Sequence, residues 1–315
     1  MNLKIIRKTW LAGLLALLLA GGVRADCPPT PTPPAPEQAQ RWAEQAADRG
    51  LLWRITRDGH SSYLYGSLHV GKADWAYPGP ALRAAWADTE VLAVELDPAD
   101  VGPALAAADA PEPLSPRLAA QLQAQARAAC LPPGALDPLP AMLQLSTLML
   151  LEARRDGFDA LFGQDLMLIQ WARRERRPVQ SLESVQEQLD ALAPAPGEPE
   201  ALLAGGLREL RQGRVRAPLR RLAATWARGD LAGLANYASW CGCADTPAER
   251  AWLKRVNDER NQHLAERIEA LHHAGQRLLV AVGALHMSGP EALPRLLAAR
   301  GFQVQALLPR PAPSR

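Results

Sequence analysis

The hydrophobic pattern of the chain predicts strands near both ends. Two runs rich in β-branched and aromatic residues, 51–55 and 62–66, flank an Asp58-Gly59 pair, which is a strong signal for a β-hairpin. The apolar run 91–97 is nearly continuous, as in strands that are covered on both faces. The first hundred residues are therefore expected to form a hairpin followed by a buried strand.

Between these ends, apolar residues recur with helical spacing and are interrupted by glycine and proline. One short apolar interruption, 178–183, predicts a further strand that ends in the carboxylate of Glu183. The expected helices span residues 37–49, 80–88, 117–129, 141–155, 159–176 and 202–211.

A last long helix is specified by its first residues. The segment 246–249 (Thr-Pro-Ala-Glu) combines a capping box with proline at the first helical position, and an apolar stripe continues to Leu271. Arg260 lies on the same face as this stripe. An arginine there either snorkels outward from the edge of the stripe or is buried and paired with a carboxylate. Snorkelling is the commoner outcome.

Strand, helix and strand follow one another twice, once within 62–97 and again within 278–308. In such βαβ units the strands are parallel and the crossover is right-handed. We therefore predict an α/β fold of mixed α+β character, with a central, mostly parallel sheet built from two βαβ units related as a pseudo-repeat. A large helical insertion, about 99–276, separates the units, and residues 37–309 form a single domain.

The same short motif leaves a strand in each unit. Gly66 is followed three residues later by His69, and Gly283 is followed three residues later by His286. A residue without Cβ allows a sharp turn off the strand and close approach of a ligand. Glu95 stands at the carboxyl end of the strand 91–97, and open α/β sheets bind ligands at that edge. These residues are therefore expected to share one pocket.

Two histidines and one carboxylate at strand ends predict a metal site. Imidazole together with carboxylate suits zinc, manganese, cobalt or ferrous iron, and three protein ligands, His69, His286 and Glu95, leave a position open for water. A bound metal lowers the pKa of that water and polarises a carbonyl, and hydrolysis requires both effects. A single Gly-x-x-His is more often structural, but its duplication and the carboxylate at the end of an apolar strand strengthen the functional interpretation.

Other ionisable residues are weaker candidates. Glu183 also ends an apolar strand and is an alternative to Glu95 for the same role. Asp165 lies beside apolar residues on a predicted helix, where aspartate is usually solvated. The remaining four histidines are interpreted as surface or structural residues: His60, His263, His272 and His273.

The N-terminus predicts export. Residues 1–25 contain a basic n-region, an apolar h-region and a small-residue cleavage signal, with cleavage expected after Ala25. Lipidation at Cys27 is the alternative, but the residues before it do not match the Leu-Ala-Gly/Ala-Cys pattern. A proline-rich, disordered leader is expected over 26–36 and a disordered tail over 310–315. The protein is thus predicted to be periplasmic or secreted, without a transmembrane span after cleavage.

Net charge and cysteine content limit the classes of protein to which the chain could belong. The 315 residues carry a formal net charge of +2, without the basic stripe of a nucleic-acid-binding protein, so no nucleic-acid partner is expected. Four cysteines fit an oxidising compartment and two disulfides, in any of three connectivities: Cys27, Cys130, Cys241 and Cys243. A bond between the last two is the least expected, because so small a loop has poor geometry.

An ordered set of motifs resembles the TraB/GumN family, which includes the TIKI proteins, from about residue 50 to 308. The motifs are the segments 52–55 (Leu-Trp-Arg-Ile), 63–70 (Tyr-Leu-Tyr-Gly-Ser-Leu-His-Val), 94–97 (Val-Glu-Leu-Asp), 163–165 (Gly-Gln-Asp), 177–183 (Arg-Pro-Val-Gln-Ser-Leu-Glu), 226–230 (Trp-Ala-Arg-Gly-Asp), 259–261 (Glu-Arg-Asn) and 281–289 (Ala-Val-Gly-Ala-Leu-His-Met-Ser-Gly). Ser67 stands where threonine is commoner in this family.

The resemblance implies a metal-dependent hydrolase fold, shared with TIKI-type proteases and, more distantly, with erythromycin esterases and ChaN-like haem-binding proteins. It implies that His69 and His286 bind a divalent ion, manganese, cobalt or zinc, and that Glu95 is a ligand or the general base. Arg260 would hold that glutamate or stabilise an oxyanion. Further pocket candidates are Gly66, Gly283, Asp165, Glu183 and Asn261.

The predicted function is that of an exported, metal-dependent, peptidase-like hydrolase acting on a peptide or another carbonyl-containing substrate. The alternative is a non-catalytic periplasmic protein that binds a peptide, signal or haem in the same cleft. A structural member of the family without activity is a third possibility.

Overall fold

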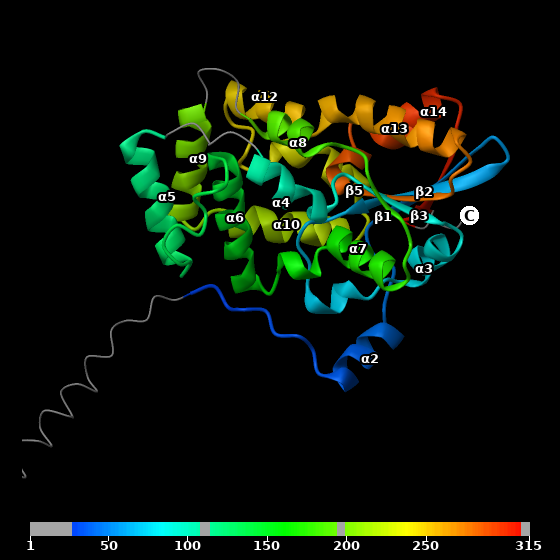
Figure 1. The fold of residues 1–315 in the computed structure, drawn as a ribbon, viewed down its shortest axis with the longest axis horizontal. Coiled ribbons are helices and arrows are strands. Elements are labelled where there is room, and N and C mark those ends of the chain that lie inside the picture. Colours follow the sequence, from blue (N-terminus) through cyan, green and yellow to red (C-terminus); the bar gives the residue numbers. More distant parts are fainter. Residues whose placement is uncertain (1–26, 108–113, 194–198, 310–315) are drawn as a thin grey trace, which may run out of the picture.

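A six-stranded sheet flanked by helices forms one end of the molecule, and a group of helices forms the other (Figure 1). The computed structural model describes residues 27–107, 114–193 and 199–309. The predicted signal segment 1–25 and the predicted tail 310–315 lie outside these residues. No helix in the described part of the chain is long and apolar enough to cross a bilayer.

The predicted hairpin is confirmed. Strands β1 (Leu51–Arg57) and β2 (His60–Ser67) pair antiparallel, and Arg57 faces His60 across the turn. Asp58 and Gly59 form the turn with φ of 51° and 80°. Two consecutive positive φ angles give the turn the twist of its flanking strands, and Asp-Gly adopts them at little cost.

The strand order is β4-β3-β5-β2-β1-β6, where β3 is Val91–Val94, β4 is Val179–Ser181, β5 is Leu278–Gly283 and β6 is Gln303–Leu308. The first four strands of this order run parallel, whereas β1 is antiparallel to both of its neighbours. The mixed α/β architecture is confirmed. The two strands of each predicted βαβ unit run parallel but are not neighbours in the sheet, and their relation as a pseudo-repeat stays a prediction. Strand β5 lies between β2 and β3, and β6 pairs with β1 at the far edge.

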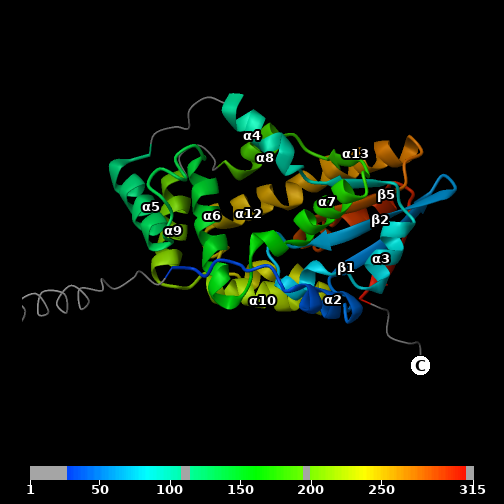
Figure 2. The ribbon, with the colours of Figure 1, turned by 60° about the horizontal axis from the view of Figure 1, so that its bottom comes forward.

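The helices largely follow the predicted segments, with shorter ends (Figures 1 and 2). Their bounds are α2 Pro36–Glu44, α3 Pro80–Ala87, α4 Pro98–Ala107, α5 Pro116–Ala128, α6 Ala141–Ala153, α7 Gln164–Arg174, α8 Val185–Leu192, α9 Pro199–Arg211, α10 Arg216–Ala227, α11 Leu231–Ala235, α12 Pro247–Val256, α13 Asn261–His273 and α14 Leu293–Ala299. Helices α5, α6 and α9 pack around a leucine-rich cluster of their own, separate from the core that covers the sheet.

The predicted last long helix is interrupted, which corrects the expectation of one continuous helix. Its capping box is present, since Thr246 and Glu249 exchange the two expected hydrogen bonds. However, α12 ends at Val256, and Asn257 adopts φ −123° and ψ −75°. A single 3-10 turn that ends at Arg260 then leads into α13. The break turns Arg260 out of the helical stripe and toward the sheet edge.

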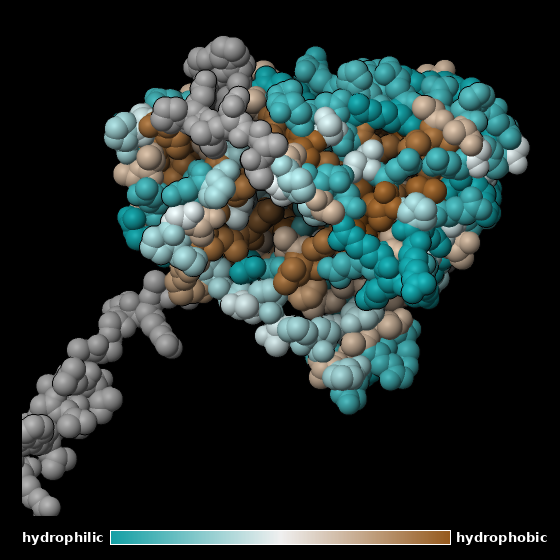
Figure 3. All heavy atoms as spheres, in the orientation of Figure 1, coloured by the Kyte–Doolittle hydropathy of each residue, from teal (hydrophilic) through white to brown (hydrophobic). Residues whose placement is uncertain are grey.

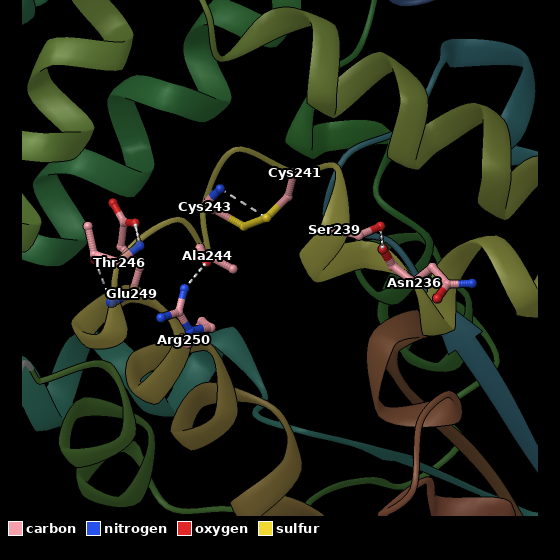
Figure 4. Close-up of a disulfide and its surroundings, with 8 residues drawn as sticks. All are labelled: Asn236, Ser239, Cys241, Cys243, Ala244, Thr246, Glu249 and Arg250. Carbon is pink, nitrogen blue, oxygen red and sulfur yellow. Dashed lines mark hydrogen bonds between the residues drawn. A yellow bond between two sulfur atoms is a disulfide. The ribbon is translucent and has the colours of Figure 1, made fainter.

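The cysteines form two disulfides, Cys27–Cys130 and Cys241–Cys243. The second is the pairing that was least expected, so that prediction is wrong (Figure 4). Gly242 between the two cysteines has φ +66°, and this left-handed conformation, which glycine adopts without strain, tightens the chain until the two Cα atoms are 5.1 Å apart. That separation lies within the normal range for a disulfide.

Candidate functional site

The carboxyl ends of four adjacent parallel strands place their following residues at one edge of the sheet. In the register, Ser67 of β2 faces Gly283 of β5, and Val94 of β3 faces Ala281 of β5. His69, His286 and Glu95 therefore follow three neighbouring strands, and Glu183 follows β4 beside them. We name His69, Glu95, Asp165, Arg260 and His286 the sheet-edge site.

His286 is buried and held by Asn261, a residue that the resemblance placed in the pocket. The Nδ1 atom of His286 lies 2.6 Å from Oδ1 of Asn261, whose amide nitrogen donates to the carbonyl of Glu291 at 2.7 Å. The Asn261 oxygen must therefore accept, so Nδ1 of His286 is the donor. Burial lowers the pKa of His286, although Glu95 acts in the opposite direction. The Nε2 atom of this neutral ring lies 3.7 Å from Oε1 of Glu95.

His69 is held by Asp165, whose position corrects the expectation of a solvated aspartate. The Nδ1 atom of His69 lies 2.9 Å from Oδ2 of Asp165. The charge of Asp165 raises the pKa of His69 to about 9. Because the side chain of His69 is 61% exposed, its ring remains accessible to a ligand.

Glu95 is buried and ionised. Burial by itself raises its pKa, but His286, Arg260 and His69 together hold the pKa well below its usual range. Its Oε1 atom accepts a hydrogen bond from the Gly283 amide at 2.6 Å, and its Oε2 atom accepts one from Arg260 at 2.5 Å.

Arg260 joins the two buried glutamates, so it does not snorkel outward. Its Nε donates to Glu183 Oε1 at 2.8 Å, and its Nη2 donates to both Glu183 Oε2 and Glu95. Its Nη1 donates to the carbonyl of Val256 at 2.9 Å. Glu183 is therefore a partner of the arginine and not a substitute for Glu95.

The glycines of the two Gly-x-x-His motifs, Gly66 and Gly283, leave room for neighbouring atoms. A Cβ atom on Gly66 would lie 3.2 Å from the Cα of Ala284, and one on Gly283 would lie 3.3 Å from Oε1 of Glu95. The carbonyl of Gly66 also accepts a hydrogen bond from the buried Trp226 indole at 2.6 Å. Glycine therefore allows the close approach of a neighbouring strand end and of the Glu95 carboxylate, whereas the predicted approach of a ligand stays a prediction.

A cavity of about 370 Å³ opens at this edge, with His69, Glu95, Asp165 and Arg260 among its lining residues. Ser67 also lines it, and its buried Oγ has no hydrogen-bond partner among the described residues. The same holds for the Oδ1 atom of Asp165. Buried polar atoms are rarely left unpaired, so these two atoms mark a place for a polar ligand. From the sequence, Ser67 stood out only as a departure from the family's usual threonine.

The side chains of the sheet-edge site include imidazole and carboxylate groups, which are common ligands of divalent ions. Both histidines donate Nδ1–H to an oxygen acceptor, which is the usual orientation of metal-binding histidines. The neutral ring of His286 has a lone pair on Nε2, whereas His69, with a pKa of about 9, would have to release its Nε2 proton to bind an ion. The carboxylates of Glu95 and Glu183 pair with the guanidinium of Arg260, and the carboxylate of Asp165 pairs with His69. Within the described residues, however, no three His, Cys, Asp or Glu side chains are gathered as closely as metal ligands.

The other histidines lie away from this edge. His272 is fully buried and bonds to Ser62 and to the carbonyl of Arg57, while His60 stacks on its ring at 3.8 Å. The exposed His263 and His273 form only long contacts with acidic side chains. The structural or surface interpretation of these four residues agrees with their contacts.

A mostly parallel, mixed sheet that carries two Gly-x-x-His turns and a glutamate at one edge defines an α/β protein with its candidate site at the strand carboxyl ends. The chain belongs to the TraB/PrgY/gumN family, whose model matches residues 51–306. It is 25% identical over 248 residues to a protein named "Uncharacterized protein YbaP" from Shigella flexneri, covering 75% of this chain and 87% of that protein. The protein of the same name from Escherichia coli K12 is 25% identical over 256 residues, covering 77% and 90%. No solved structure matches the chain significantly.

Proposed function

We propose that this protein is an exported, metal-dependent hydrolase of peptidase-like specificity that acts at the sheet-edge site. The observation that supports the proposal best is the matched orientation of His69 and His286. Each ring is held through Nδ1, at 2.9 Å by Asp165 and at 2.6 Å by Asn261, so Nε2 is the ring atom that could bind an ion, after loss of its proton in the case of His69. The predicted signal segment and the two disulfides agree with export.

A manganese, cobalt or zinc ion would be held by His69, His286 and Glu95. Such an ion polarises a carbonyl and increases the acidity of water. The low pKa of Glu95 makes this carboxylate a weak base near neutral pH, so it suits a ligand better than a general base. Asp165 orients His69 through Oδ2, and its Oδ1 has no hydrogen-bond partner among the described residues. Arg260 positions Glu95, because its N–H groups already bond to two carboxylates and a carbonyl.

The proposal is tested by calorimetric titration of manganese into the purified, metal-stripped protein. We expect about one ion per chain, and we expect His69→Ala and His286→Ala each to weaken binding by at least tenfold, because each removes a ligand. His263→Ala is the matched control, since the side chain of His263 is 72% exposed and its recorded contact is with Glu266, outside the sheet-edge site. Equal affinity in the parent and in both site variants would exclude the shared metal site.

Turnover distinguishes the enzyme from a binding protein with the same cleft. Incubation of the manganese-loaded protein with a peptide library is expected to remove intact peptides, and Glu95→Gln is expected to stop this loss. A Soret band on titration with haem, without any peptide cleavage, would instead assign the cleft to haem binding.

A further inference from the structure

The cavity at the sheet-edge site is lined by two kinds of side chain. The first kind comprises the ionisable groups of the site and the unpartnered hydroxyl of Ser67. The second kind is aliphatic, and we name five of these residues the apolar wall: Leu96, Val101, Leu143, Leu192 and Val256. The uncharged polar residues Ser146 of α6 and Gln188 of α8 also line the cavity. Figure 3 shows apolar residues gathered around a hollow on the face where α4 and α6 lie in Figure 1.

The apolar wall belongs mainly to helices inserted between the strands of the sheet. Val101 lies on α4, Leu143 on α6, Leu192 at the end of α8 and Val256 at the end of α12. Trp252 of α12 donates to the carbonyl of Leu192 at 3.2 Å, which ties α8 to α12. The wall is thus supported by packing and hydrogen bonding around the opening of the site.

The charges in the cavity restrict what this wall can accept. Among the described residues, the ionisable side chains that line the cavity are those of the site: His69, Glu95, Asp165 and Arg260. Glu95 and Arg260 already bond to each other, and Asp165 bonds to His69. A charged substrate group placed against the wall would therefore lose its hydration without gaining a free counter-ion, which is costly. An aliphatic group would bury apolar area favourably.

Ligand pockets generally combine an apolar lining with a few polar groups that fix orientation. Here the polar residues of the lining, Ser67 and Asp165 among them, are the partners for a substrate's polar backbone. On the basis of the proposed hydrolase function, we propose that the substrate is a peptide with a large aliphatic residue next to the cleaved bond. That residue packs on the apolar wall, and Leu143 and Val101 determine this preference.

The experiment compares acetylated peptide amides that differ in one residue, leucine or aspartate, with the manganese-loaded protein. We expect the leucine peptide to be hydrolysed with a kcat/KM at least ~10-fold higher, within the range that hydrophobic pockets achieve. Leu143→Asp is expected to remove this preference. Val101→Ser tests the same wall with a smaller change, in case Leu143→Asp does not fold. Leu145→Ala is the control, because Leu145 is on the same helix but packs in the separate helical cluster.

The outcomes separate the two proposals when the dissociation constants of the same peptides are measured by calorimetry. Hydrolysis without a preference for leucine, or a preference unchanged in both wall variants, overturns the aliphatic subsite and leaves the hydrolase intact. Binding that favours leucine and is lost in Leu143→Asp, without hydrolysis, supports the subsite and overturns the enzyme. Neither binding nor hydrolysis of any peptide overturns both.

Discussion

Arg260 illustrates how one side chain determines the electrostatics of the whole site. It is only 16% exposed and pairs with Glu95 and Glu183, whose side chains are 10% and 4% exposed. Removing one partner from a buried ion pair leaves an uncompensated charge, which is far more costly than the net benefit of the intact pair. Arg260 therefore holds Glu95 in place, lowers the pKa of Glu95 and pairs with Glu183.

We predict that Arg260→Ala lowers the free energy of unfolding at pH 7 by about 3–5 kcal/mol, the range for a broken buried pair. Arg260→Lys should recover only part of this loss, because an ammonium cannot reproduce the bidentate contact with Glu183. Urea unfolding monitored by circular dichroism measures both values. The control is Arg214→Ala, which breaks an exposed pair with Glu209 and should lower the free energy of unfolding far less, because exposed ion pairs contribute little to stability. A similarly small loss of stability for Arg260→Ala would contradict the assignment of Arg260 as the buried partner of Glu95 and Glu183.

At the scale of elements, a buried histidine links α13 to the hairpin and to β5. The carbonyl of Arg57 can only accept, so Nε2 of His272 donates to it at 3.0 Å, and Nδ1 accepts from the hydroxyl of Ser62 at 2.9 Å. The same hydroxyl oxygen accepts from the amide of Leu278 at 3.0 Å. Burial lowers the pKa of His272, so this chain of hydrogen bonds needs the neutral ring.

This arrangement predicts a pH-dependent loss of stability. The folded-state pKa of His272 is below its unfolded value of about 6.5, so the unfolded chain binds a proton first as the pH falls. The contribution of His272 is fully present above about pH 6.5 and decreases below it. We expect His272→Gln to be less stable than the parent at pH 8 and to show a smaller further loss between pH 7 and pH 5 in urea unfolding. If the free energies of unfolding of the variant and of the parent changed in parallel with pH, this role of His272 would be contradicted.

The break between α12 and α13 shows that contacts between elements can override a local helical pattern. The capping box at Thr246 was predictable because it depends on four consecutive residues. The interruption at Asn257 was not, because the apolar stripe continues across it and satisfies helical periodicity. Contacts with the sheet edge decide the local conformation there, and Arg260 can reach Glu95 and Glu183 only because the helix is interrupted.

Across the whole molecule, the two disulfides differ in what they constrain. Cys27–Cys130 joins the segment after the predicted signal to the end of α5, with a sequence separation of 103 residues. Cys241–Cys243 encloses one residue only. In the chain-entropy model a crosslink stabilises by restricting the unfolded chain, and the effect grows with loop length.

We therefore predict that Cys27→Ser/Cys130→Ser lowers the free energy of unfolding by about 2–5 kcal/mol, and that Cys241→Ser/Cys243→Ser lowers it by about 1.5 kcal/mol or less. Thermal or urea unfolding of the oxidised double variants measures this difference. The opposite order would show that the small loop contributes by packing or strain in the folded state.

The sequence by itself determined the features that depend on neighbouring residues. The hairpin follows from Asp58-Gly59, the strands from their apolar runs, and the placement of His69, His286 and Glu95 at strand ends from the position of each motif. The carboxyl ends of parallel strands meet at one edge whatever their order, so a shared site was predictable without knowledge of the order.

The tertiary structure alone decided which distant residues became partners. Strand β5 inserts between β2 and β3, Asp165 orients His69, Glu183 shares Arg260 with Glu95, and Cys241 bonds to Cys243. Each of these outcomes depends on strand order or on a local backbone turn, which hydrophobic periodicity does not encode. Local pattern therefore located the site at the sheet edge, whereas long-range packing determined its charge balance and the apolar wall beside it.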